Sequence, residues 1–152
     1  MSVSPARTVA FAAIRRTFEH DAFTDRALRA EAQAADLGSG RDLALATTLA
    51  FGTVQRRATL DHVIGELTGR GIDRLDARVL TALRLGLFQL LFLDRVPRHA
   101  AVDESVQLAK PSPGAGLVNA VLRRATREGT ALLAALGDET PERAAVKHSV
   151  PV

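Results

Sequence analysis

With 152 residues, of which 47% are hydrophobic, the sequence is long and apolar enough for one domain with a sizeable core, which excludes a disordered chain. It contains no cysteine, which excludes disulfides, thiolate metal ligands and a thiol nucleophile. The formal net charge of +3 is unevenly distributed: residues 1–16 and 110–127 carry cations and no acid, whereas residues 17–55 carry six acids against three arginines.

The chain is predicted to be a series of helices, because apolar residues recur at helical spacing and Gly or Pro residues separate the runs. Ser4 followed by Pro5 is typical of a helix start. No segment shows the sustained alternation of a strand. We therefore predict an all-α fold, a compact helical bundle of about seven or more helices. Helices are expected over residues 4–20, 25–36, 40–56, 59–68, 75–94, 99–110 and 115–128, with shorter pieces over 129–136 and 141–147.

Residues 79–93 form the longest apolar run, and they are apolar nearly all round a helix. Such a helix is typical of the centre of a bundle, where other helices cover it on every side. Thr81, Arg84 and Gln89 interrupt this run of 15 residues, which is short for a membrane span. The N-terminus also lacks the apolar segment of a signal peptide. We therefore expect a soluble cytoplasmic protein that has no membrane partner.

Patterns that would indicate catalysis or metal binding are weak in this sequence. The four histidines lie far apart, so no pair has the spacing of a metal site. Glycine pairs at 38–40, 69–71 and 114–116 complete no nucleotide-binding motif and are better interpreted as helix stops. Asp103 and Glu104 could form a catalytic pair, but the helix dipole alone favours acids near a helix start, and no nucleophile accompanies them. We predict no catalytic residue, no metal site and no cofactor in this chain.

The acidic pair belongs to the stretch 94–110, DRVPRHAAVDESVQLAK, in which Pro97 and His99 precede it. Proline cannot continue the preceding helix without losing a backbone hydrogen bond, so the chain is expected to break here and begin a new helix. We interpret the stretch as a structural joint between two helices. His99 is predicted to be a packed or capping residue rather than a ligand.

The two basic stretches are the best candidates for ligand binding. Arg123, Arg124 and Arg127 share one edge of a helix, because residues three and four positions apart face the same way. The absence of nearby acids favours an anion, and nucleic acid is the obvious polyanion, although a solvated face with no ligand is the alternative. The two stretches could converge on one face. Since only 4% of the residues are aromatic, recognition of backbone and shape is favoured over base stacking.

A family resemblance is carried by residues 83–110, LRLGLFQLLFLDRVPRHAAVDESVQLAK, and by residues 116–125, GLVNAVLRRA. Both strongly resemble the NusB-like family, which comprises bacterial transcription antitermination factors and the N-terminal domains of small-subunit ribosomal RNA cytosine methyltransferases. The variants RVPRHAAVDES and VNAVLRR resemble the methyltransferase branch, as does the segment HSVPV at 148–152. The resemblance implies a NusB-like RNA-binding domain over residues 1–147 and the start of a linker to a methyltransferase domain over 148–152.

The resemblance implies a non-catalytic RNA-binding domain that helps to position small-subunit ribosomal RNA for a methyltransferase domain in cis. Methylation in that family uses a cysteine thiolate and S-adenosylmethionine, so the cofactor is expected only in the catalytic domain. The alternative is a stand-alone antitermination factor that binds a short single-stranded RNA together with a small ribosomal protein. A third alternative is a helical protein-interaction module with no RNA role.

The residues expected to contact RNA come from charge and from the resemblance together. In the antitermination relatives the arginine-rich N-terminus and the segment around Val-Asn take part in RNA binding, and the matching residues here are Arg7, Arg15, Arg16 and Asn119. The remaining candidates rest on charge alone. Asp103 departs from the family, which often has Asn at that position. The predicted RNA-binding residues are Arg7, Arg15, Arg16, Lys110, Asn119, Arg123, Arg124 and Arg127.

Overall fold

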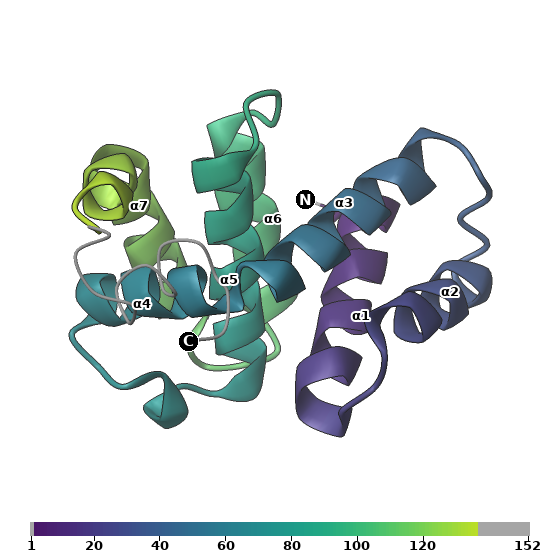
Figure 1. Ribbon diagram of the computed structural model, residues 1–152, viewed down its shortest axis with the longest axis horizontal. Helices are drawn as coiled ribbons and strands as arrows, with labels where there is room; N and C mark the ends of the chain where they lie inside the picture. Colours follow the sequence, from purple (N-terminus) through teal and green to yellow (C-terminus); the bar gives the residue numbers. More distant parts are fainter. Residues whose placement is uncertain (1, 137–152) are drawn as a thin grey trace.

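The computed structural model describes residues 2–136, and in that range every regular element is a helix (Figure 1). The all-α prediction is therefore confirmed for this part of the chain. Seven α-helices and one short 3-10 helix follow one another through connections of a few residues. They are α1 (Pro5–His20), α2 (Thr24–Ala34), α3 (Arg41–Gln55), α4 (Arg57–Thr68), η1 (Ile72–Arg74), α5 (Ala77–Phe92), α6 (Arg98–Ala109) and α7 (Ala115–Ala134).

Helix α5 lies at the centre of the bundle, as its sequence predicts. All residues from 81 to 90 are buried, including the polar Thr81, Arg84 and Gln89. Helices α1 and α3 pack against one side of α5, and α4, α6 and α7 pack against the others (Figure 1). A helix covered in this way must be apolar nearly all round, because any charged side chain on it needs a partner inside the protein.

Close packing around α5 depends on small residues. A Cβ atom at Gly86 would lie only 2.6 Å from Leu122 Cδ1 and 2.9 Å from Ser105 Oγ, so a side chain there would push α6 and α7 away. Gly52 on α3 lies against the ring of Phe88 in the same way. Interiors packed to crystal-like density tolerate little added volume. These two glycines therefore set the distance between α5 and its neighbours.

The last helices differ from the predicted pattern. The predicted piece over 129–136 is not separate, because α7 continues through Gly129 to Ala134. Gly129 is buried, and a Cβ atom there would lie 2.9 Å from Leu91 Cδ2, so tertiary packing overrides the low helix propensity of glycine. The predicted helix over 141–147 and the linker over 148–152 lie outside the described residues. None of the described helices is both long and apolar enough to cross a membrane.

Candidate functional site

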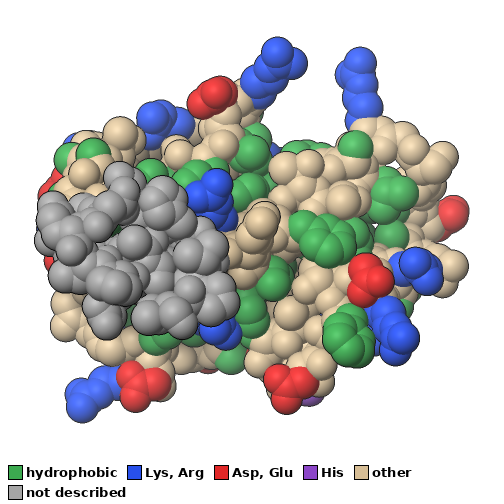
Figure 2. Space-filling model, in the orientation of Figure 1, with side chains coloured by type: hydrophobic (Ala, Val, Ile, Leu, Met, Phe, Trp, Pro, Cys, Tyr) green, Lys and Arg blue, Asp and Glu red, His purple; other side chains and the backbone are tan. Residues whose placement is uncertain are grey.

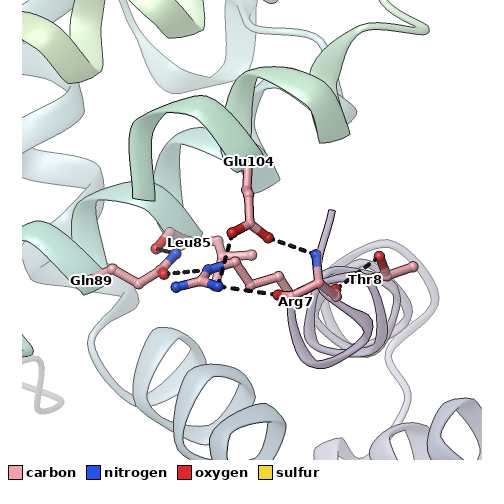
Figure 3. Close-up of polar contacts among 6 residues, drawn as sticks. Arg7, Thr8, Leu85, Gln89 and Glu104 are labelled. Carbon is pink, nitrogen blue, oxygen red and sulfur yellow. Dashed lines mark hydrogen bonds and ion pairs between the residues drawn. The ribbon is translucent and has the colours of Figure 1, made fainter. Parts of the chain in front are cut away.

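Arg7 lies inside the protein and not on the surface that the sequence predicts (Figure 3). Its Nε donates to Gln89 Oε1 at 2.8 Å, and its Nη1 donates to Glu104 Oε2 and to Ser4 Oγ, each at 3.1 Å. The backbone N–H of Ser4 donates to the other carboxylate oxygen of Glu104 at 2.7 Å. We call these four residues, Ser4, Arg7, Gln89 and Glu104, the α1 clasp, because they join the start of α1 to α5 and α6.

Arg15 and Arg16 remain at the surface but are paired with acids. Arg15 Nη2 donates to Glu19 Oε1 at 2.9 Å, one turn further along α1, and the hydrogen bond holds the pKa of Glu19 below its ordinary value. Arg16 Nη1 lies 3.4 Å from Glu31 Oε1 and so links α1 to α2. The charge of the N-terminal basic stretch is therefore largely neutralised by acids that follow it in the sequence.

Lys110 is exposed at the C-terminal end of α6, where the helix dipole favours a cation. Close to it, Arg78 Nε donates to the carbonyl oxygen of Leu108 at 2.8 Å and ties the start of α5 to the end of α6. Asp76 caps α5 by accepting from the backbone N–H of Arg78 at 2.7 Å, and it also accepts from Ser112 Oγ at 3.2 Å. The hydrogen bond from the Arg78 backbone lowers the pKa of Asp76.

Arg124 is the one member of the predicted α7 edge that has an acidic partner within the described residues. Its Nε donates to Glu128 Oε2 at 2.7 Å, and this hydrogen bond lowers the pKa of Glu128. Its Nη1 donates to the carbonyl oxygen of Leu67 at 3.0 Å, at the end of α4. Arg124 thus joins α7 to α4 and satisfies a carbonyl group in the last turn of that helix.

Arg123 and Arg127 are exposed and lie further than 4.0 Å from every carboxylate of the described residues. Their contacts are with neutral oxygen atoms. Arg123 Nε donates to Asn119 Oδ1 at 3.0 Å, and Arg127 Nη1 donates to the carbonyl oxygen of Arg123 at 3.3 Å. Asn119 therefore orients a cation on its own helix. Each guanidinium group therefore has several N–H donors that no described residue uses.

A groove of 320 Å³ lies beside these two arginines, between the first turns of α6 and the middle of α7. Arg98 Nη1 donates to the carbonyl oxygen of Thr126 at 3.3 Å and so holds the start of α6 against α7. The α6–α7 groove is lined by Arg98, His99, Val102, Asp103, Arg123, Thr126 and Arg127.

Arg98 and His99 are missing from the predicted site. His99 is neither packed nor capping, because it is exposed and Pro97 occupies the N-cap position of α6, so that prediction is wrong. A signal for Arg98 was present in the sequence. A helix dipole disfavours a cation in the first turn, so an arginine there indicates something other than helix stabilisation.

Helix α5 lies between α1 and α7, so a helix separates the arginines of α1 from those of α7 (Figure 1). The start of the second basic stretch lies nearer to α1, because Asp76 accepts a hydrogen bond from Ser112 and also interacts with the charge of Arg15. On the face drawn in Figure 2, the Lys and Arg side chains of the described residues are scattered singly rather than gathered in a patch.

A second hollow, of 460 Å³, lies between α2 and α3 and is mainly apolar, with Leu28, Leu43 and Phe51 in its wall. Figure 2 shows hydrophobic side chains at the surface over these helices. Phe23, at the start of α2, is 69% exposed, and Phe51 is 41% exposed. Asp25 and Arg29 also line this hollow, so its charges are mixed.

Comparison with protein families finds that the model of the NusB family matches residues 4–127. The chain belongs to the NusB family. Among curated relatives, the ribosomal RNA small subunit methyltransferase B of Pseudomonas putida is 45% identical over 100 residues, which are 63% of this chain and 22% of that protein. The protein of the same name from Pseudomonas syringae pv. tomato is 41% identical over 109 residues, 69% of this chain and 24% of that protein. The chain thus spans about a quarter of the length of these relatives.

Solved structures with this NusB fold agree with the family assignment. The NusB chain in a crystal structure of the antitermination factors NusB and NusE with double-stranded RNA superposes with a TM-score of 0.75. It is 23% identical, and the match covers 81% of this chain and 94% of that one. NusB from T. maritima superposes with a TM-score of 0.72 at 22% identity, over 84% of this chain and 94% of that one. The bundle described above is therefore a NusB fold.

Proposed function

We propose that this chain is a non-catalytic RNA-binding domain of an S-adenosylmethionine-dependent ribosomal RNA cytosine-5 methyltransferase, and that it helps to position small-subunit ribosomal RNA. One observation carries the proposal. The relatives named ribosomal RNA small subunit methyltransferase B are 45% and 41% identical to a region that the NusB family model also matches, and this region is about a quarter of their length. A separate domain within a longer enzyme fits that relationship.

The chemistry of the chain supports a binding role. Cytosine-5 methylation in the resembling enzymes uses a cysteine thiolate, and this sequence contains no cysteine. Its exposed arginines suit RNA phosphates, because the planar guanidinium can donate two parallel hydrogen bonds to one phosphate. The catalytic residues and the cofactor would then belong to a methyltransferase domain in cis.

A second candidate is a stand-alone antitermination factor. It is favoured by one observation: the matched region covers 94% of the NusB chain in the structure with NusE and RNA, so this chain has nearly all the parts of such a factor. The sequence identity of 23% to that chain is well below the 45% and 41% shared with the methyltransferases. We therefore rank it second.

The test is RNA binding by this chain, measured by fluorescence anisotropy with labelled single-stranded segments of small-subunit ribosomal RNA and with scrambled RNA of equal length. Three phosphate contacts give a slope of log affinity against log salt of about −2, so affinity should fall roughly 20-fold for about a fourfold rise in salt. No salt-dependent binding at low salt would contradict the proposal. Tighter binding in the presence of a small ribosomal protein, with no preference for ribosomal RNA, would favour the second candidate.

A further inference from the structure

We infer that the α6–α7 groove is the place where this domain grips the RNA backbone, with Arg98, Arg123 and Arg127 donating to phosphate oxygens. The inference rests on the proposed function and assigns it to a defined set of side chains. Two of the groove residues, Arg98 and His99, lie outside the basic stretches of the sequence. Helix packing brings these two residues against α7, although they precede the α7 residues of the groove by more than twenty positions in the sequence.

The side chains that line the groove carry a net positive charge. Among the described residues, three arginines line it against one carboxylate, that of Asp103. Within the described residues no carboxylate lies within 4.0 Å of Arg98, Arg123 or Arg127, whereas Arg7, Arg15, Arg16, Arg84 and Arg124 each have such a partner. The groove thus has more cationic than anionic side chains in its lining. A bound polyanion would supply the missing counter-charge.

The N–H donors of the groove arginines are held in fixed directions. The three groove arginines donate to neutral oxygen atoms, namely two backbone carbonyls and the amide oxygen of Asn119. These bonds fix the direction of each side chain and use only part of its five N–H donors. The rest stay free for a ligand. Side chains held in place in this way lose less conformational entropy when a phosphate binds.

Arg98 lies in the first turn of α6. The helix dipole places positive partial charge there, so a cation is unfavourable unless something negative is bound close by. The walls also fit a phosphate better than an apolar peptide, because Val102 is the only apolar one among the described residues that line the groove. Charge, donor geometry and wall chemistry thus point to one ligand, the sugar-phosphate backbone of RNA.

Replacing Asp103 should change RNA affinity in the direction opposite to the loss of a groove arginine. Its carboxylate lines the groove and repels a phosphate, yet it makes no ion pair with the groove arginines. Replacing it with Asn keeps its size and removes its charge. Asp103→Asn should therefore tighten RNA binding, whereas loss of an arginine should weaken it. A purely structural role for the groove predicts no such reversal of sign.

The experiment compares Arg98→Gln, Arg127→Gln and Asp103→Asn with two control variants, Arg29→Gln and Arg41→Gln. The controls remove the same charge from exposed positions on α2 and α3. Loss of one groove arginine should make the slope of log affinity against log salt shallower by about 0.7. It should also weaken RNA affinity roughly fivefold at about 0.1 M salt. The controls should stay near the wild-type values. Urea unfolding of every variant checks that the fold is kept.

The outcomes separate the two claims. If the wild-type chain binds RNA and the groove variants behave like the controls, the groove inference is wrong and the proposed function stands. Weaker binding by Asp103→Asn would also overturn the groove. If the wild-type chain shows no salt-dependent RNA binding, the proposed function fails and the groove inference fails with it. Loss of affinity in both groove arginine variants, together with a gain in Asp103→Asn, would establish the site.

Discussion

At the start of α1, Arg7 is surrounded by oxygen atoms from Ser4, from α5 and from α6, whereas at the start of α6, Arg98 is exposed beside two further arginines. Both residues belong to the first turn of a helix, and both point to a neighbouring helix. The α1 clasp has a carboxylate, Glu104, and the α6–α7 groove leaves its cations unpaired among the described residues. The position of the acids therefore separates a structural arginine from one available to a ligand.

This difference teaches that a basic stretch in a sequence is no measure of surface charge. The N-terminal stretch contains no acid, yet Glu19, Glu31 and Glu104 neutralise its three arginines in the folded chain. Glu104 lies 97 residues from Arg7. In α7, by contrast, only Arg124 has an acidic partner in the described structure. Charges counted along the sequence thus overestimate the unpaired positive charge on α1 and underestimate it at the start of α6.

The largest expected effect comes from breaking the α1 clasp. Glu104→Gln leaves the guanidinium of Arg7 buried without its counter-charge, since the two side chains are only 9% and 14% exposed. Removing one partner of a buried pair costs about 3 to 5 kcal/mol of unfolding free energy, and we expect about 3 here because Gln89 still accepts a hydrogen bond. Urea unfolding followed by circular dichroism measures it.

The matched control is Glu31→Gln, which removes the acid opposite Arg16 at a site where the two side chains are 43% and 29% exposed. Solvent screens such a pair, so we expect a loss of less than about 1 kcal/mol. Equal losses in the two variants would mean that the α1 clasp behaves as a surface ion pair. The distinction between a buried arginine and one available to a ligand would then be wrong.

A double replacement sharpens the same comparison. Arg7→Met with Glu104→Leu removes both charges and fills the space with apolar atoms, so it should be more stable than Glu104→Gln by at least about 1 kcal/mol. Because Arg7 is buried, the folded double variant should also keep the wild-type salt slope of RNA binding. Anisotropy titrations at several salt concentrations measure that slope. A shallower slope would show that Arg7 contacts RNA, as the sequence predicts.

Much of the fold follows from the sequence alone. The apolar run over 79–93 predicts the buried central helix, and the predicted helix ranges fall within a few residues of α1 to α6. The failure at Gly129 has a physical reason. Helix propensity is a local quantity worth about 1 kcal/mol for glycine, and the contact with Leu91 comes from another helix. No local rule could have anticipated that contact.

The candidate site follows from the sequence only in part. The charge of Arg123 and Arg127 is visible in the chain, as is their shared helix edge. Arg98 and Arg123 lie on different helices, and only tertiary packing makes them neighbours. Likewise, nothing local pairs Arg7 with Glu104. Sequence reasoning thus finds which residues carry charge, while the fold decides which charges remain available.

Arg124 offers a contrast within a single helix. Arg124→Gln removes the bond to the Leu67 carbonyl and the ion pair with Glu128, so it should lower the unfolding midpoint by less than Glu104→Gln does. It should leave the salt slope of RNA binding unchanged, whereas Arg127→Gln should make that slope shallower by about 0.7. Unfolding curves and salt titrations on both variants test the split. Equal slopes in the two variants would show that pairing with an acid does not decide availability.

The smallest expected effect concerns Asp76, on the α1 side of the molecule. Its pKa is lowered from the ordinary 3.8, first by the backbone hydrogen bond from Arg78 and further by the hydrogen bond from the side-chain hydroxyl of Ser112. A lowered folded-state pKa means that the carboxylate stabilises the fold at pH values above the unfolded-state pKa. This contribution is lost as the pH falls through the folded-state pKa.

Asp76→Asn separates this charge effect from the cap itself, because Asn is also a good N-cap residue. Wild type should be slightly more stable than Asp76→Asn at neutral pH, and the gap in unfolding free energy should narrow as the pH falls from about 5 through the folded-state pKa, which lies below 3.8. Urea unfolding across that range measures the gap. A gap that stays constant would mean that the side-chain amide caps α5 less well for geometric reasons. Asp76 would then stabilise the fold through the geometry of its hydrogen bonds and not through its charge, unlike Glu104 in the α1 clasp.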